Sequence, residues 1–347
     1  MKPFLALALL SSSLLLPCWL IATESSSHSP PQPRQDAAEP SSHPPAQPRQ
    51  DAALPTASSP QKSGTEVTLM GIYFNDPRSG WAVGSGGAVL KTGDGGKRWR
   101  AVRSGTTALL TAVYFTDLKN GWIVGANGSI LHSKDAGEKW VPQVSETPAP
   151  LYGVYFLTPS RGWAVGGGGT ILHTDDGGQT WSDQPSGTNA ILYGVHFTDP
   201  DHGGVAGALG TILLTADGGK TWAPQDTNSS ATFFDIFFSA PQNAWVVGNA
   251  GAMFQTIDGG QRWVDRTLPC LQNCSRLTDL LRVRFTDARS GWIVGEHGAI
   301  YRTTDAGFSW TAQENKVKQS LYGLSFPDAT HGWASGEGGT ILKISTR

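Results

Sequence analysis

Short apolar stretches, separated by glycine- and aspartate-rich turns, follow one another along most of this chain. In one part of it, the apolar run Leu151–Phe156 is followed by Gly162–Gly166, then by residues 170–174, and then by a segment that begins at Trp181. Short runs bounded by turn residues are typical of β-strands, and none of these stretches has the 3.6-residue period of an amphipathic helix. The pattern therefore predicts a set of four short strands.

This four-strand pattern repeats along the chain. One column of the repeat holds tryptophan in every unit but the fourth: Trp81, Trp122, Trp163, Gly204, Trp245, Trp292 and Trp333. The step is 41 residues throughout except between Trp245 and Trp292, where it is 47. Four-stranded units of about 40 residues are typical of the blades of a β-propeller. The sequence therefore predicts an all-β fold, a seven-bladed β-propeller of four-stranded antiparallel blades.

The seventh unit ends before its fourth strand, and a segment near the N-terminus matches the missing part. Residues 58–64 are in register with residues 181–187 of the third unit. A propeller removes free strand edges by closing into a ring. We predict that residues near 57–64 pair with the strand around 340–345, so that an N-terminal strand completes the last blade. The propeller domain then covers residues 57–347.

The first part of the chain has a different composition. An uncharged apolar run, residues 4–22, follows Lys2, which predicts that residues 1–23 are a signal peptide or an uncleaved membrane anchor. Both interpretations imply export. Residues 24–56 are rich in Pro, Ser, Ala and Gln, and a seven-residue segment starting at Gln32 recurs at Gln47. This composition predicts a disordered spacer, which would tether the propeller to a membrane if the N-terminus stays embedded.

Charge and cysteine content limit the possible partners. The formal net charge of −2 gives no attraction to nucleic acid. Cys270 and Cys274 lie in the unit where the period lengthens. In an exported chain they either form a disulfide that closes the inserted loop or remain free thiols. No further Cys or His pair lies nearby at ligand spacing, so we predict no metal site and no cofactor.

A second column of the repeat holds an aspartate that is followed five residues later by tryptophan: Asp94, Asp135, Asp176, Asp217, Asp258 and Asp305. These motifs resemble the Asp-box (BNR) repeat of sialidases and other propellers, in which the boxes are structural. Six carboxylates spaced around a ring cannot converge on one substrate, so we predict structural Asp boxes and no catalytic residues. The alternative, an Asp-box propeller that binds or cleaves glycans as sialidases do, requires two carboxylates facing one bond or an arginine cluster.

The units differ most in their first strand. One column holds a small residue in five units and a charged residue in two: Gly71, Ala112, Gly153, Gly194, Asp235, Arg282 and Gly323. We expect Asp235 and Arg282, on adjacent blades, either to pair at the ring axis or to take part in binding. Arginines concentrate in this sector, and the residues predicted to bind a protein partner are Arg276, Arg282, Arg284, Arg289, Arg302, Glu296 and His297. A solvated rim is the alternative.

The complete unit reads Leu-Tyr-Gly-Val-x-Phe, then Gly-Trp-Ala-Val-Gly, then Gly-Thr-Ile-Leu-x-Thr-x-Asp-Gly-Gly-x-Thr-Trp. Over residues 58–347 this pattern resembles the photosystem II stability and assembly factor family of seven-bladed propellers. The resemblance implies a location on the periplasmic or thylakoid-lumen side, binding of newly made reaction-centre protein through an arginine-bearing surface, and no catalysis. We therefore expect an exported, monomeric, non-catalytic scaffold whose client is a subunit of a membrane or envelope complex.

Overall fold

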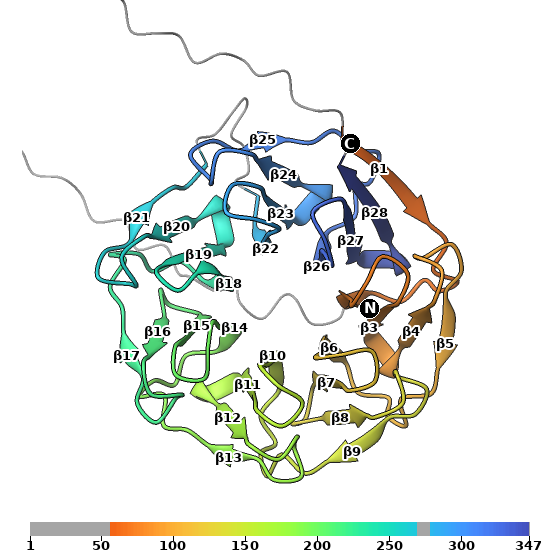
Figure 1. Cartoon of the computed structure of the whole chain (residues 1–347), viewed down its shortest axis with the longest axis horizontal. Helices are drawn as coiled ribbons and strands as arrows, with labels where there is room; N and C mark the ends of the chain where they lie inside the picture. The colour runs from red at the N-terminus through yellow and green to blue at the C-terminus, as the bar shows by residue number, and fades with distance from the viewer. Residues whose placement is uncertain (1–55, 269–277, 347) are drawn as a thin grey trace, which may run out of the picture. The chain divides into compact units, whose positions relative to one another are not determined.

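The structure, a computed structural model, describes residues 56–268 and 278–346. Within these ranges the chain forms seven four-stranded antiparallel sheets arranged around a ring (Figure 1). The predicted seven-bladed propeller is therefore confirmed. The predicted leader and spacer, Cys270, Cys274 and Arg276 lie outside the described residues. Among the described residues, no helix has the length and hydropathy needed to cross a membrane.

The blades follow one another in chain order, with the first strand of each blade nearest the axis (Figure 1). The strands of blades 1 to 3 are β2 (Leu69–Phe74), β3 (Gly80–Gly84), β4 (Val89–Thr92), β5 (Arg100–Val102), β6 (Leu110–Phe115), β7 (Gly121–Gly125), β8 (Ile130–Ser133), β9 (Val141–Gln143), β10 (Leu151–Phe156), β11 (Gly162–Gly166), β12 (Ile171–Thr174) and β13 (Ser182–Asp183). Those of blades 4 to 6 are β14 (Leu192–Phe197), β15 (Gly203–Gly207), β16 (Ile212–Thr215), β17 (Ala223–Pro224), β18 (Phe233–Ala240), β19 (Asn243–Gly248), β20 (Met253–Thr256), β21 (Val264–Asp265), β22 (Leu280–Phe285), β23 (Gly291–Gly295), β24 (Ile300–Thr303) and β25 (Thr311–Ala312). Blade 7 consists of β26 (Leu321–Ser325), β27 (His331–Gly336), β28 (Ile341–Thr346) and β1 (Thr56–Gln61). Short 3₁₀ turns join the second and third strands of five blades: η2 (Ser85–Gly87), η3 (Gly167–Gly169), η4 (Asn249–Gly251), η5 (Glu296–Gly298) and η6 (Glu337–Gly339).

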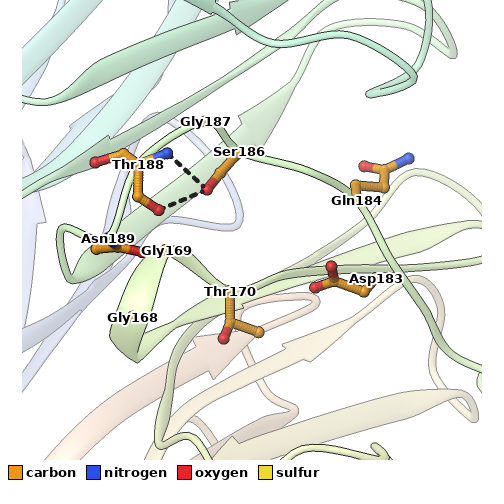
Figure 2. A pocket seen from close by; sticks show the side chains of 9 residues that line it. All are labelled: Gly168, Gly169, Thr170, Asp183, Gln184, Ser186, Gly187, Thr188 and Asn189. Carbon is orange, nitrogen blue, oxygen red and sulfur yellow. Dashed lines mark hydrogen bonds between the residues drawn. The ribbon is translucent and has the colours of Figure 1, made fainter.

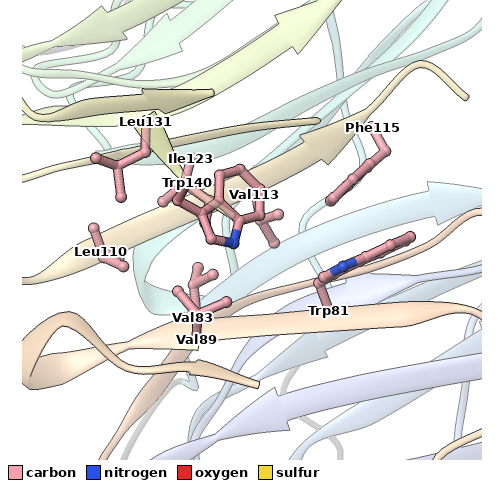
Figure 3. Close-up of a cluster of buried hydrophobic side chains, with 9 residues drawn as sticks. All are labelled: Trp81, Val83, Val89, Leu110, Val113, Phe115, Ile123, Leu131 and Trp140. Atoms are coloured by element: carbon pink, nitrogen blue, oxygen red, sulfur yellow. The ribbon is translucent and has the colours of Figure 1, made fainter. Parts of the chain in front are cut away.

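Tryptophan and phenylalanine hold neighbouring blades together. The ring of Trp81 in blade 1 stacks on Phe115 of blade 2, with centroids 3.7 Å apart (Figure 3). Phe115 pairs with Gly121 on the next strand, and a Cβ at Gly121 would lie 2.3 Å from the phenylalanine ring. Glycine is therefore needed beside each stacked phenylalanine, which explains the Gly-Trp dipeptide of the repeat.

Blade 4 has glycine in the tryptophan column, and neighbouring side chains occupy the space. A Cβ at Gly204 would lie 2.8 Å from Leu214 and from Ile236. Leu214 takes the third-strand position that Lys91 holds in blade 1. An aliphatic side chain thus fills part of the volume of the missing indole, and the blade keeps its place in the ring.

The Asp boxes lie in the turns between third and fourth strands and bond to their own turns. Asp176 Oδ1 accepts hydrogen bonds from the Thr180 N–H at 2.9 Å and from the Thr174 hydroxyl at 2.8 Å. The bonds from Thr180 are the main reason why the pKa of Asp176 falls to about 2. A carboxylate with its acceptor sites used in this way stabilises the turn and is a poor candidate for acid–base chemistry.

Strand β1 lies antiparallel to β28, with Ser58 opposite Ile344 and Gln61 opposite Ile341. This strand is the outermost of blade 7, since the sheet order is β1-β28-β27-β26. That the N-terminal strand is what holds the ring closed stays a prediction, and a test is given in the Discussion.

Candidate functional site

Seven equivalent side chains of the inner strands form a ring around the axis, called here the axial ring: Tyr73, Tyr114, Tyr155, His196, Phe237, Arg284 and Ser325. Consecutive aromatic members have centroids 4.7 to 5.1 Å apart, from Tyr73 through to Phe237. The Arg284 guanidinium lies 5.5 Å from the Phe237 ring. These residues lie on the first, innermost strand of each blade, so the sequence column from Tyr73 to Arg284 forms one continuous row of contacts around the axis.

The aromatic part of the axial ring is neutral at physiological pH. Burial raises the pKa of Tyr73 to about 12 and raises that of Tyr114 well above its ordinary value. Burial, followed by the charge of Arg284, lowers the pKa of His196 to about 3. His196 therefore carries no charge at pH 7, and its Nδ1 is buried without a hydrogen-bond partner among the described residues.

The charge of the axial ring comes from blades 5 and 6. Arg284 Nη1 donates to Asp235 Oδ2 at 2.5 Å, and the Val283 N–H donates to the same oxygen at 3.0 Å. Arg282 Nη1 instead donates to two carbonyl oxygens, those of Leu281 at 2.7 Å and Phe234 at 3.3 Å. Burial lowers the pKa of Arg282, and the nearby charge of Asp235 opposes that effect.

The expected pair between Asp235 and Arg282 is therefore corrected. The direct ion pair is made by Arg284, because the Val283 N–H holds the Asp235 carboxylate beside residue 284. Two guanidinium groups on β22 thus face one carboxylate whose Oδ2 already accepts two hydrogen bonds. The axial ring and its neighbours carry one uncompensated positive charge.

The other sequence-predicted residues lie elsewhere on the blade. Arg289 is exposed in the β22–β23 turn, where its carbonyl accepts a hydrogen bond from the Asp-box residue Ala306. Arg302 lies on β24, with its guanidinium 5.1 Å from the Trp292 ring. Glu296 and His297 form the η5 turn at the other end of the blade, since Glu296 N–H bonds to the Asp279 carbonyl that precedes β22. The structure therefore brings Arg282 and Arg284 together and separates them from the rest.

Two features beside η5 complete this end of the ring. The carboxylate of Glu337 accepts hydrogen bonds from the Tyr322 hydroxyl at 2.9 Å and the Ser320 N–H at 3.2 Å. Burial and then Asp279 raise the pKa of Glu296. The charge of Glu337 also raises the pKa of Glu296, which indicates that the two carboxylates lie near each other on the same face of the propeller.

A second set of aromatic contacts, which was not predicted from the sequence, is made by Tyr152, Tyr193 and Phe234. Their centroids are 5.1 and 5.5 Å apart from blade to blade. Each directly precedes the column of small residues in its first strand, so the column could have been found from the repeat. The backbone of Phe234 also accepts a hydrogen bond from Arg282, so this set of contacts reaches the residue that binds one arginine of the pair.

Outside the axis, an open pocket with a volume of about 620 Å³ lies at the rim of blade 3. Figure 2 shows Asp183, Gln184 and Ser186 around it, with the Ser186 hydroxyl bonded to Thr188. Asp183 is the only carboxylate among its lining residues, whereas glycoside hydrolysis requires two. Within the described ranges, no group of three His, Cys, Asp or Glu side chains could hold a metal ion.

A family model described as photosynthesis system II assembly factor YCF48 matches residues 56–149 and 225–314, together more than half of the chain. The chain belongs to this family. The resemblance of the repeat to the photosystem II stability and assembly factor family is thereby confirmed, and membership in a family of assembly factors agrees with the expectation of a non-catalytic protein. A search of curated proteins by sequence finds no match.

Solved structures agree in fold. A structure described as YCF48 bound to D1 peptide is 21% identical, with a TM-score of 0.70, over 84% of this chain and 96% of the other. YCF48 from Cyanidioschyzon merolae is 23% identical, with a TM-score of 0.68, over 83% and 98%. A streptogramin B lyase is 14% identical, with a TM-score of 0.72, over 84% and 98%. At these identities the likeness shows the propeller fold alone. The match to the lyase therefore says nothing about the activity of this YCF48 family member.

Proposed function

We propose that this chain is a non-catalytic assembly factor that binds a segment of a protein client, a membrane-complex subunit, at the arginine pair of β22. Membership in the YCF48 family and the D1 peptide bound by one relative support this function. The observation that carries the proposed site is the placement of Arg282 and Arg284 against a single carboxylate, Asp235, within an otherwise neutral axial ring.

The geometry suits a peptide carboxylate. Only Nη1 of Arg282 and of Arg284 has a hydrogen-bond partner among the described residues, which leaves Nε and Nη2 of each guanidinium available. Guanidinium binds carboxylate with paired hydrogen bonds, and such bonds are roughly twice as strong as neutral ones. The ring of Phe237, 5.5 Å from the Arg284 guanidinium, offers apolar contact for the rest of the segment.

The test measures binding of a D1 peptide to the purified propeller by fluorescence anisotropy. We expect Arg282→Gln and Arg284→Gln each to weaken binding by about 10-fold or more, because a hydrogen bond to a charged group is worth about 1.5–3 kcal/mol. Arg289→Gln is the matched control, since Arg289 is exposed at the far turn. Unchanged binding in both axial variants, or an equal loss in Arg289→Gln, would overturn the axial site.

We further propose that the chain is exported and acts as a monomer on the periplasmic or thylakoid-lumen side. The uncharged apolar run at residues 4–22 and the Pro-rich composition that follows support this proposal. If the leader remains uncleaved, the spacer tethers the propeller beside its membrane-bound client. N-terminal sequencing of the mature protein from fractionated cells distinguishes a cleaved signal peptide from an anchor.

A further inference from the structure

The rim of the propeller repeats one contact between neighbouring blades. A glutamine at the end of the outer strand reaches the Asp box of the next blade: Gln61 Nε2 donates to the Gly95 carbonyl at 3.0 Å, and Gln143 Nε2 to the Gly177 carbonyl at 2.9 Å. In blade 5 the equivalent position is Arg266. Its Nε donates to Gln255 Oε1 at 3.3 Å, and its guanidinium lies 5.7 Å from the ring of Phe308. The seam between blades 5 and 6 therefore differs in chemistry from the seams that a glutamine bridges.

Blades 1 and 2 show which side chains meet at such a seam. Lys91 Nζ lies 2.7 Å from Glu138 Oε1, and Arg100 forms an ion pair with the same carboxylate. The equivalent positions in blades 5 and 6 are held by Gln255, Val264 and Phe308. An ion-pair cluster joins blades 1 and 2. At the same three positions, blades 5 and 6 carry no charged side chain and have two apolar ones.

The apolar side chains of the blade 5–6 seam are exposed. Phe308 is 78% exposed, Ile257 69% and Val264 38%. The position of Phe308 is polar in the other five boxes, where it is held by Lys97, Glu138, Gln179, Lys220 and Gln261. Ile257 shares a side with Gln255, as the contact between the equivalent residues His173 and Asp175 shows. Several positions of the repeat that lie at the blade 5–6 seam therefore hold residues unlike those of the other blades.

We propose that Ile257, Val264, Arg266 and Phe308, called here the rim patch, dock a protein segment that presents an apolar side chain next to a carboxylate. Phenylalanine supplies the apolar contact, and an arginine stacked on it supplies the charge. The terminal nitrogens of Arg266 have no bonding partner among the described residues. The rim patch involves none of the axial residues, so it provides a second point of attachment.

The guanidinium of Arg266 selects a carboxylate-bearing segment, because its terminal nitrogens have no bonding partner among the described residues. The neighbouring acids bond to their own turns, since Asp258 Oδ1 accepts from the Arg262 N–H and Asp265 Oδ1 accepts from the Thr267 N–H, and neither forms an ion pair with Arg266 in the described part of the chain. Arg262 is exposed on the same box and adds a second cation. The outer edge of β21 also lies open here, because β21 is the last strand of its sheet.

The experiment places benzoyl-phenylalanine at residue 308 of the full chain, expressed in its own cells, and irradiates it. The matched control carries the same group at Gln179, the exposed equivalent position of blade 3. We expect a discrete protein adduct at 308 and not at 179, mapping to a segment that holds a carboxylate beside an apolar residue. An adduct with lipid, identical adducts at both positions, a segment without a carboxylate, or no adduct at all would overturn the proposal.

The mapped segment, as a synthetic peptide, then provides a quantitative readout. Arg266→Gln and Phe308→Gln introduce residues that other blades carry at these positions, so the fold is kept and unchanged thermal unfolding verifies this. We expect each variant to weaken peptide binding by about 10-fold. Arg284→Gln, which disturbs the axial site, is expected to leave this binding unchanged. Equal binding by wild type and both rim variants would contradict the assignment.

Discussion

Arg284 and Asp235 form an ion pair between blades 6 and 5, with Arg284 Nη1 and Asp235 Oδ2 2.5 Å apart. The Asp235 side chain is 7% exposed and that of Arg284 is 30% exposed. Since Asp235 also accepts a backbone hydrogen bond from Val283, the same carboxylate joins the two inner strands and balances one of the two arginines. Stability and the charge of the axial ring are therefore linked through a single residue.

Replacing Asp235 is expected to destabilise the propeller. Asp235→Asn keeps an acceptor for the Val283 N–H but leaves Arg282 and Arg284 without a counter-charge, which we expect to cost about 1–3 kcal/mol of unfolding free energy. Urea denaturation measures this change. In the double variant Asp235→Asn/Arg284→Gln, part of the loss is expected to be recovered, because one of the uncompensated cations is gone. If the two single substitutions lower the unfolding free energy by amounts that add up in the double variant, Asp235 and Arg284 are not directly coupled.

Stability is expected to fall as the pH drops from 7.5 to 4.5. The folded pKa of His196 is about 3 and its ordinary value is 6.5, so unfolding takes up a proton between these two pH values. The contribution is complete well above pH 6.5 and is lost as the pH falls toward 3, by about 3 kcal/mol at pH 4.5. His132, with a pKa of about 4, adds a loss of the same sign.

The variant His196→Phe isolates this effect. It preserves ring contacts with Tyr155 and Phe237 and removes the titrating group. We expect its urea midpoint to change less than that of the wild type over the same pH range. The Asp boxes lose their stabilising effect only at lower pH, because the pKa of Asp176 is about 2, below its ordinary value of 3.8. Equal pH dependence in variant and wild type would show that His196 is not the source.

The fold could be predicted from the sequence because the repeat presents the same constraint several times. Each Gly-Trp dipeptide reflects a phenylalanine ring that leaves no room for a Cβ, as at Gly121 beside Phe115. A column that recurs at a fixed period therefore defines a blade without knowledge of any contact. The departures at Asp235 and Arg282 were also visible, because they break a column of small residues.

The hydrogen-bond and ion-pair partners within the site could not be predicted from the sequence. Arg282 and Arg284 lie on the same side of β22, and only the hydrogen bond from Val283 decides which of them Asp235 meets. Arg289 is separated from that pair because it lies in the exposed turn that follows β22, beyond the strand that carries both axial arginines. The stack of Arg266 on Phe308 joins an outer strand to the following Asp box, a contact between blades that no single repeat contains.

Glycosidase assays are expected to give no activity. The cavity of blade 3 has Asp183 as its only carboxylate, and Asp-box carboxylates such as Asp176 are bonded to their own turns. A panel of chromogenic glycosides and a glycan array measure hydrolysis and binding. Hydrolysis that disappears in Asp183→Asn would show that a second acid reaches this cavity. Binding on the array that survives in both axial arginine variants would favour a glycan ligand at another surface.

Removal of strand β1 is expected to open the ring. Variants lacking residues 1–55 and 1–61 differ only in β1, which lies against β28 through pairs such as Ser59 with Lys343. The longer deletion leaves the β28 edge unpaired, with Ile341 and Ile344 on that strand, and exposed edges promote aggregation. We expect the melting temperature to fall by about 10 °C in the longer deletion, equivalent to a loss of about 3 kcal/mol, and not in the shorter one. Adding back residues 56–61 as a peptide is expected to restore part of the loss, since the strand supplies backbone hydrogen bonds without a covalent link. Equal melting temperatures of the two variants would show that the ring closes without its N-terminal strand.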